Sequence, residues 1–304
     1  DIGCNDGSLL SFFKAKGATT IGLEPTNAIE DAADEHFLYN EFFDKTSAEK
    51  ILQDHGSLDI ISFTNVFAHI EDLNGLIESL MILITPNTRL VVENHYLGSI
   101  IKNNQFDTFY HEHPRTYSLS SFYKIAEKLG LCIFATEFPA RYGGNIRVFM
   151  GNASLKKAVT NPELQLVLDD EDTFGDLLAG MQANMETWKT KKNKEIMDLV
   201  KVHGPLKAKA FPGRAAIFIK LLGLDENSID CVYEKPGSMK IGHYLPGTRI
   251  PIKSDDEFFA LSSPPAVIVN MAWHISTEIH QFLKKKGFLG EIIDIYDPNW
   301  LNEK

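Results

Sequence analysis

Asp1-Ile2-Gly3-Cys4-Asn5-Asp6-Gly7 opens the chain, and together with the residues that follow it indicates an α/β fold. Ser8–Ala15 has the apolar spacing of a helix, and Thr20–Leu23 is rich enough in apolar residues for a buried strand. The two glycines let the backbone turn tightly and approach a ligand at the start of a helix, where the backbone carries partial positive charge. Glu24 ends the next strand, where a carboxylate can accept both hydroxyls of a ribose.

This arrangement predicts a site for an adenosine-type cofactor. The turn reads G-x-N-x-G, so it lacks the G-x-G-x-x-G pattern that a dinucleotide pyrophosphate requires. A ligand without phosphate, such as S-adenosylmethionine (SAM), fits such a turn better. The alternative is that Gly3 and Gly7 only shape the turn. The residues expected to bind the cofactor are Asp1, Gly3, Asn5, Gly7, Glu24, Pro25 and Asn65.

Short apolar runs and amphipathic stretches alternate through the first half of the chain. We expect buried strands at Thr20–Leu23, Asp59–Phe63 and Arg89–Glu93, and helices at Ser8–Ala15, Ser47–Gln53 and Asn74–Ile84. This alternation predicts an α/β fold with a parallel sheet covered on both faces. Asn145–Met150 is a further strand, antiparallel if Gly143-Gly144 forms a turn.

Residues 161–203 turn helical and polar, and Gly204-Pro205 ends that stretch. After it the alternation of strands and helices resumes. We expect strands at Ile229–Tyr233, Ala266–Ala272 and Glu291–Tyr296, and helices at Asp255–Leu261 and Ser276–Lys285. The predicted organisation is a Rossmann-like domain at 1–155, a helical connector at 156–204 and a second Rossmann-like α/β domain at 205–304.

The composition argues against several classes of protein. The 304 residues carry a net charge of -11, which argues against a nucleic-acid or anionic-membrane surface. No apolar run reaches the ~18 residues of a membrane span, and three widely spaced cysteines favour a reduced, cytoplasmic protein. Residues 201–304 carry 13 basic and 12 acidic groups and are nearly neutral, unlike the acidic remainder. The chain begins inside a strand–turn–helix motif, so we expect that an upstream part is missing.

Two groups of polar residues carry candidate chemistry. Asn65 and His69 follow the strand at Asp59–Phe63, where the carboxyl ends of parallel strands border a ligand cleft. Tyr110-His111-Glu112-His113 places a phenol, a carboxylate and two imidazoles within four positions, which offers a base, an orienting partner and a hydrogen-bond donor. Metal binding by the two histidines and Glu112 is the alternative, as is a plain polar loop.

These motifs resemble the SAM-dependent sugar C-methyltransferases, which act on nucleotide-linked keto-deoxysugars. The likeness runs through D-I-G-C-N-D-G, E-P, N-x-x-x-H-I and Y-x-E-H, and covers nearly the whole chain. It continues at Tyr142-Gly143-Gly144-Asn145-Ile146-Arg147, at 244–252 and at Ala272-Trp273-His274. The resemblance implies a class I SAM-methyltransferase domain and a second domain that anchors the nucleotide of the substrate.

The resemblance also implies residue roles. It places the general base at His113, and Asn65 and His69 near the sugar. From the chemistry of the side chains we further expect Glu112 to hold the His113 ring while an enolate forms, and Tyr110 or His69 to donate a hydrogen bond to the enolate oxygen. Tyr142 stands where the family often has histidine, and the glycine-rich turn of the second domain is reduced to Phe211-Pro212-Gly213-Arg214. The family's cysteine-rich zinc domain would precede this chain, and no metal site is expected within it.

A diphosphate substrate needs cations. Lys240 and Arg249 are the expected substrate-binding residues together with Asn65 and Tyr142, and Arg214 and Lys220 are further candidates. Two alternatives to a sugar C-methyltransferase remain at this point. One is a SAM-dependent O-methyltransferase of a sugar or small molecule, which needs only a base near a hydroxyl. The other is a SAM-binding fragment without catalysis.

Overall fold

The computed structural model describes residues 1–155, 162–298 and 300, and the chain forms two compact units. The first contains Asp1–Ile100 and His111–Gly175. The second contains the segment Ile101–Tyr110 and everything from Asp176 onward. The start of the predicted connector, 156–161, lies outside the described residues, as do residue 299 and residues 301–304 of the expected last domain.

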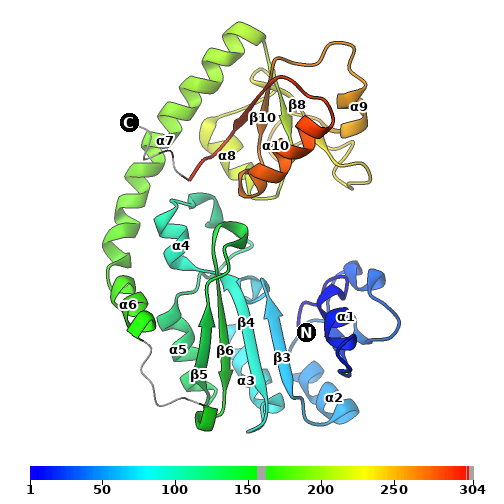
Figure 1. Ribbon diagram of the computed structural model, residues 1–304, viewed down its shortest axis with the longest axis vertical. Coiled ribbons are helices and arrows are strands. Elements are labelled where there is room, and N and C mark those ends of the chain that lie inside the picture. Colours follow the sequence, from blue (N-terminus) through cyan, green and yellow to red (C-terminus); the bar gives the residue numbers. More distant parts are fainter. Residues whose placement is uncertain (156–161, 299, 301–304) are drawn as a thin grey trace. The chain divides into compact units, whose positions relative to one another are not determined.

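A mixed sheet forms the centre of the first unit. Its strands are β1 (Ile21–Leu23), β2 (Phe37–Tyr39), β3 (Ile60–Thr64), β4 (Arg89–His95), β5 (Cys132–Glu137) and β6 (Asn145–Gly151). Ile2 bridges to Leu23 and to Phe63 and so joins the β1–β2 pair to the strands β3, β4, β6 and β5, which lie in that order (Figure 1). Only β6 runs antiparallel to its neighbours, as the antiparallel prediction for Asn145–Met150 required.

Helices supply the apolar faces that cover this sheet. The helices of the first unit are α1 (Ser8–Lys14), α2 (Lys45–His55), α3 (Leu73–Leu83), α5 (Leu119–Lys128) and α6 (Pro162–Glu171). The helix α4 (Leu97–Lys102) follows β4 and runs from the first unit into the second. Asp44 and Ser118 begin α2 and α5 with capping boxes, in which each side chain accepts a backbone N–H of the first turn. Phe63, Phe67 and Phe122 are fully buried in the resulting core.

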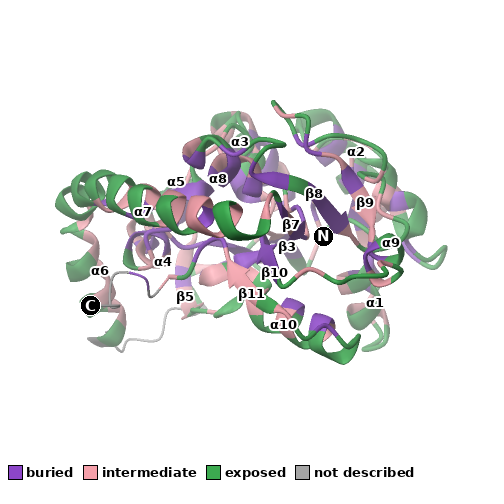
Figure 2. Ribbon diagram, turned by 90° about the horizontal axis from the view of Figure 1, so that it is seen from above, coloured by how far each residue is buried: buried purple, intermediate pink, exposed green. Residues whose placement is uncertain are grey.

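A parallel five-stranded sheet in the order β11-β10-β7-β8-β9 forms the second unit. Its strands are β7 (Leu206–Lys209), β8 (Ile229–Glu234), β9 (Ile252–Ser254), β10 (Val267–Asn270) and β11 (Glu291–Asp294), and its helices are α8 (Ala215–Leu222), α9 (Asp255–Phe259) and α10 (Ser276–Lys285). Beside the sheet lies α7 (Phe174–His203), which begins in the last residues of the first unit. Figure 2 shows β7 and β8 buried and most of α7 exposed.

The α/β prediction is therefore confirmed, and each predicted strand and helix overlaps an observed one. The structure adds elements that the apolar patterns did not reveal, namely β2, α4, α5, β5, β7, α8 and β9. Several of these are short. The helix α4 lies within Asn94–Gln105, which was interpreted as a connection leading to the Tyr110–His113 motif, whereas α5 follows that motif.

A cavity of about 520 Å³ opens between β1 and β3 at the amino ends of these strands, with Ile21, His55 and Ile60 in its wall. The polar groups of the first unit gather at the opposite edge, where Glu24, Asn65 and His95 stand at the carboxyl ends of β1, β3 and β4. Ligands of open α/β sheets bind at that carboxyl edge, so the cavity does not mark the site.

Candidate functional site

The glycine turn after Ile2 is built from left-handed backbone. Gly3 and Gly7 have φ angles of 74° and 72°, and Asn5 between them has a φ of 51°. A Cβ added at Gly3 would overlap with the Val66 side chain, and one at Gly7 would lie 2.9 Å from the Cβ of Ala32. Glycine is therefore required at both positions for packing as well as for conformation.

We expect Gly3→Ala to destabilise the first unit by about 2–4 kcal/mol, because left-handed strain adds to overpacking against Val66. Gly17→Ala is the matched control: Gly17 has a φ of 88° but no atom within 4 Å of an added Cβ, so only the backbone cost applies. Denaturant unfolding of both variants measures the difference. Equal losses in the two variants would contradict the tight packing of this turn.

The carboxylate of Glu24 closes the turn from the end of β1. Glu24 is buried, and its two carboxylate oxygens accept the backbone N–H groups of Asn5, at 3.1 Å, and Thr26, at 2.9 Å. The side chain of Asn40 fixes the strand end by donating to the backbone oxygen of Glu24 at 2.8 Å. A buried carboxylate with unused lone pairs beside an exposed turn residue fits the hydroxyl donors of a ribose. Pro25 follows it, half-buried, and Asp1 accepts the Ser62 hydroxyl at 2.8 Å.

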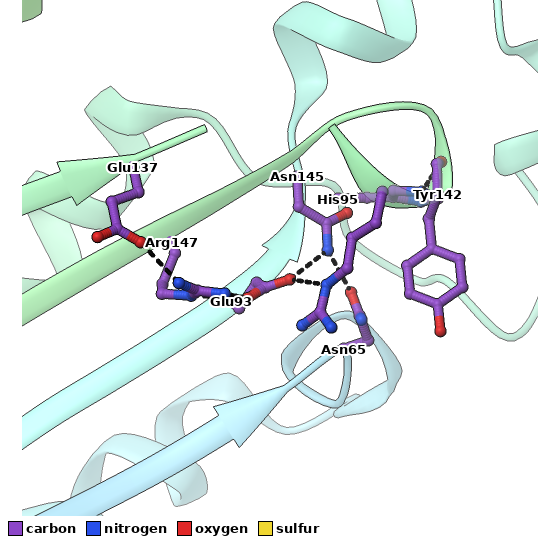
Figure 3. A network of polar contacts seen from close by, with 8 residues as sticks. Asn65, Glu93, His95, Glu137, Tyr142, Asn145 and Arg147 are labelled. Carbon is purple, nitrogen blue, oxygen red and sulfur yellow. Dashed lines mark hydrogen bonds and ion pairs between the residues drawn. The ribbon is translucent and has the colours of Figure 1, made fainter. Parts of the chain in front are cut away.

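A second buried carboxylate, Glu93 on β4, holds the neighbouring strand ends together (Figure 3). Its oxygens accept from Arg141 Nε at 2.5 Å, from Arg147 Nε at 2.7 Å and from Asn145 Nδ2 at 2.8 Å. The same Asn145 amide donates to Asn65 Oδ1 at 3.1 Å. Asn65 has left-handed backbone, with a φ of 56°, and this network therefore fixes the orientation of its side chain.

Burial acts to raise the pKa of Glu93, but the hydrogen bonds from the two arginines and Asn145 outweigh it and lower the pKa below its usual value of 4.5. The folded protein thus holds the Glu93 carboxylate ionised at pH values where the unfolded chain begins to take up a proton. Glu93 therefore stabilises the fold above pH 4.5, and this contribution is lost as the pH falls through the lower, folded-state value.

We expect Glu93→Gln to lower the free energy of unfolding at pH 7 by about 2 kcal/mol, because hydrogen bonds to an ionised group are lost. The difference from the natural protein should shrink as the pH falls below 4.5. Urea unfolding of both proteins at pH 7, 5 and 4 measures it. A difference that grew towards acid pH would show that Glu93 is not ionised in the folded state.

Three imidazoles gather at the same edge of the first unit. The ring of His113 lies 4.7 Å from the ring of His69 and 6.2 Å from that of His95, measured between centroids. Segments far apart in sequence supply them, since His69 follows β3, His95 ends β4 and His113 comes two residues after the chain returns to this unit at His111. Of the three, His113 is half-buried, His95 is buried and His69 is exposed.

Backbone carbonyls fix the tautomers of the two outer rings. His69 Nδ1 lies 2.8 Å from the carbonyl oxygen of Glu112, and His95 Nε2 lies 2.7 Å from that of Tyr142. A carbonyl oxygen only accepts, so both nitrogens carry the hydrogen. When neutral, His69 and His95 each keep one lone pair on the remaining ring nitrogen. Figure 3 shows the Tyr142 carbonyl facing His95.

The Tyr110–His113 motif is divided between the two units. Tyr110 is the last residue of the segment that belongs to the second unit, whereas His111, Glu112 and His113 belong to the first. Glu112 contributes its backbone oxygen to His69, and its side chain is exposed, as is that of His111. Tyr142, with a left-handed φ of 56°, has an exposed ring and contributes its backbone to the site.

The candidate cations of the second unit differ in burial and in the hydrogen bonds and ion pairs that they make. Lys240 donates to the backbone oxygen of Phe211 at 2.6 Å and lies 3.8 Å from Glu234, with its side chain 47% exposed. Arg249 is exposed beside the Tyr244 ring, and Lys220 is exposed on α8. Arg214 instead makes a two-pronged ion pair with Asp107, which is fully buried.

Sequence reasoning did not single out Glu93, His95, Asn145 or Asp107. A signal existed for the first two, since Glu93 and His95 directly follow a buried apolar run at the carboxyl end of a strand, where ligand-binding groups collect. Asn145 stood in the motif at Tyr142–Arg147 but was given no role of its own, and Asp107 carried no signal. Their partners are more than 50 positions away, and only the folded chain brings them together.

Two further features of the described residues concern membrane helices and metal ligands. No helix there combines the length and the apolar character that a membrane crossing requires. Within the same residues, no three His, Cys, Asp or Glu side chains are grouped as a metal site would need.

Two domain families match successive parts of the chain. The methyltransferase domain family matches residues 1–135. The family described as the C-methyltransferase C-terminal domain matches residues 140–291, which is half of the chain. The SAM cofactor expected from the glycine turn and Glu24 is the methyl donor of such enzymes.

The chain is also similar to individual proteins. The C-methyltransferase NovU of Streptomyces niveus is 27% identical over 308 residues, which cover 98% of this chain and 72% of NovU. A SAM-dependent methyltransferase from Anabaena variabilis is 16% identical with a TM-score of 0.42, covering 50% of this chain and 75% of its own. Magnesium protoporphyrin IX methyltransferase from Synechocystis with bound SAM is 17% identical with a TM-score of 0.36, covering 50% of this chain and 68% of its own. The domain matches, the α/β fold and the glycine turn with its carboxylate together show that the chain belongs to the SAM-dependent C-methyltransferase family.

Proposed function

We propose that this chain methylates a carbon beside the ketone of a nucleotide-linked keto-deoxysugar, with His113 as the general base. The observation that carries the proposal is the position of His113, half-buried between two imidazoles whose tautomers are fixed, at the sheet edge that also holds Glu24 and Asn65. The family supplies the reaction class, and NovU is a C-methyltransferase by name.

Forming a carbon nucleophile is the difficult step. A hydrogen beside a ketone is a weak acid compared with an imidazolium, so a base must act together with a group that stabilises the enolate oxygen. His113 removes the proton, as a neutral imidazole can near pH 7. A preorganised donor at the enolate oxygen contributes about 3–4 kcal/mol. When bound, SAM supplies an electrophilic methyl group for that carbon.

The tautomer of His69 indicates which neighbour of His113 donates to the enolate oxygen and which accepts the proton. A neutral His69 has its only N–H committed to the Glu112 carbonyl, so it offers a lone pair, not a donor, on its second nitrogen. We therefore assign the donor at the enolate oxygen to the Tyr110 phenol. His69, which is exposed, takes the proton from His113 and passes it to solvent. Lys240 and Arg249 of the second unit neutralise the diphosphate of the substrate.

A matched pair of substrates tests the proposal. The enzyme is incubated with SAM labelled with carbon-13 in the methyl group and with a nucleotide-linked 4-keto-deoxysugar or its 4-hydroxy counterpart. The position of the label is then read by NMR. We expect a new carbon–carbon bond beside the ketone and no product from the hydroxy sugar. Label on oxygen, or equal turnover of the two sugars, would reject the enolate mechanism.

A further inference from the structure

A buried ion pair holds the segment Ile101–Tyr110 within the second unit. Asp107 is fully buried, and its carboxylate accepts from Arg214 Nε at 2.6 Å and from Arg214 Nη2 at 2.9 Å. The indole N–H of Trp273 donates to the same carboxylate at 2.8 Å. Arg214 also donates to the Thr108 hydroxyl at 3.0 Å, and its guanidinium stacks 5.1 Å from the centre of the Trp273 ring. We call these three residues, Asp107, Arg214 and Trp273, the clasp.

Further contacts hold the same segment over its length. The Tyr296 hydroxyl donates to the backbone oxygens of Asn103 and Asn104 at 2.6 and 2.9 Å. The Phe106 ring packs against the rings of Trp188 and Phe218, at centroid distances of 5.0 and 5.8 Å. The segment is therefore a fixed part of the second unit.

The chain on either side of this segment belongs to the candidate active site. Before it, β4 carries Glu93 and His95. Tyr110 is the last residue of the segment, and His113 follows it three residues further on. The second unit thus holds the middle of a connection whose two ends carry the imidazoles of the first unit. Arg214 is only 11% exposed and is fully engaged with Asp107, so its charge is committed to holding the segment.

We propose that Arg214 and Asp107 are positioning residues, which set the place of Tyr110, and through it of His113, from within the second unit. This inference rests on the proposed function, in which the second unit anchors the nucleotide of the substrate. Arg214 begins α8, directly after the turn that follows β7. A substrate that orders this turn therefore also orders the clasp, and with it the segment that ends at Tyr110.

The direct test of the clasp needs no turnover. Asp107→Asn keeps the size of the side chain and removes its charge. We expect hydrogen–deuterium exchange, followed by mass spectrometry, to rise at least tenfold in peptides from 101–113, while peptides from β7 and β8 stay unchanged. Asp255→Asn is the matched control, since Asp255 and Lys209 form an ion pair of similar burial in the same unit, 2.9 Å apart. A rise in both variants, or in neither, would overturn the proposal.

Kinetics then separate positioning from folding. Asp107→Asn should lower kcat for methyl transfer about 10- to 100-fold, as expected for a misplaced catalytic group, with the affinity for S-adenosylhomocysteine within twofold of the natural protein. The double variant Asp107→Asn/Arg214→Met removes both charges. It should regain thermal stability but not kcat. A kcat that recovers together with stability would mean that the clasp is only structural.

The exchange and kinetic experiments distinguish a failure of the proposed function from a failure of the clasp proposal. If the keto-sugar is not the substrate, the unaltered protein gives no turnover, whereas the exchange results on 101–113 are unaffected. If the clasp does not position the motif, the unaltered protein turns over and the Asp107→Asn variant does so equally fast.

Discussion

Replacing His113 by asparagine is expected to lower the rate of methyl transfer by about 10³-fold and to leave cofactor binding unchanged. Asparagine retains hydrogen-bonding capacity but cannot take up a proton near pH 7, and general-base catalysis is worth about 10²–10⁴ in rate. His113 lies at the sheet edge, whereas the turn and carboxylate assigned to SAM are in other segments. Single-turnover methyl transfer and calorimetric titration with S-adenosylhomocysteine measure the two effects separately.

His55 provides the matched control for this experiment. It belongs to the same unit and is half-buried like His113, but it bonds to the Tyr39 hydroxyl at 2.9 Å and lines the cavity at the amino ends of β1 and β3. His55→Asn should therefore leave the rate of transfer unchanged. Near-normal turnover in His113→Asn would reject His113 as the base, and weakened cofactor binding in that variant would place His113 in the SAM site.

Local patterns in the sequence predicted the local parts of the fold well. Isoleucine- and valine-rich runs such as Asp59–Phe63 and Arg89–Glu93 have few alternatives to a buried strand, and both are strands in the structure. The helical character of the stretch up to His203 was also predicted correctly, although the structure divides it into two helices, α6 and α7. Its end was predictable because a glycine–proline pair, Gly204-Pro205, terminates a helix efficiently. The strand β2 was missed, since three residues of ordinary composition carry little periodic signal.

The parts that could not be predicted depend on contacts between distant positions. Arg214 was a candidate for the substrate diphosphate because it is a cation after a glycine turn. Its partner Asp107 is 107 positions away in a stretch without regular periodicity. Nothing in the sequence around Asp107 distinguishes a fully buried carboxylate from a solvated one. The grouping of Ile101–Tyr110 with the second unit follows from that pair and from Trp273, not from local preference.

The site of the three histidines could be predicted from the sequence only in part. His69 and His113 were identified from their motifs, and the structure brings their rings together. His95 was overlooked because it was assigned to a connection, although it ends a strand. The tautomers depended on knowing which carbonyl each ring meets, and those carbonyls, from Glu112 and Tyr142, are 43 and 47 positions away from the rings they fix. Chemical type was predictable here, but the proton positions were not.

Replacing Glu24 by glutamine is expected to weaken the binding of S-adenosylhomocysteine about 100-fold. A ribose diol donates two hydrogen bonds to a carboxylate, and hydrogen bonds to charged groups contribute about 1.5–3 kcal/mol each. Glutamine keeps one acceptor oxygen and loses the charge, so a loss near 3 kcal/mol follows, or about two orders of magnitude in Kd. Calorimetric titration measures it, with Glu30→Gln as the control. Glu30 is exposed, and its replacement makes the same change in charge six residues away.

The carboxylate of Glu24 also accepts the N–H groups of Asn5 and Thr26, so a weaker complex could reflect a distorted turn instead of lost ribose contacts. Adenosine and 2′,3′-dideoxyadenosine distinguish these causes. If Glu24 accepts the diol, the natural protein prefers adenosine and Glu24→Gln loses that preference, binding the dideoxy ligand as the natural protein does. A distorted turn would weaken both ligands equally and leave the preference intact. That result would remove Glu24 from the ribose site and assign it to shaping the turn alone.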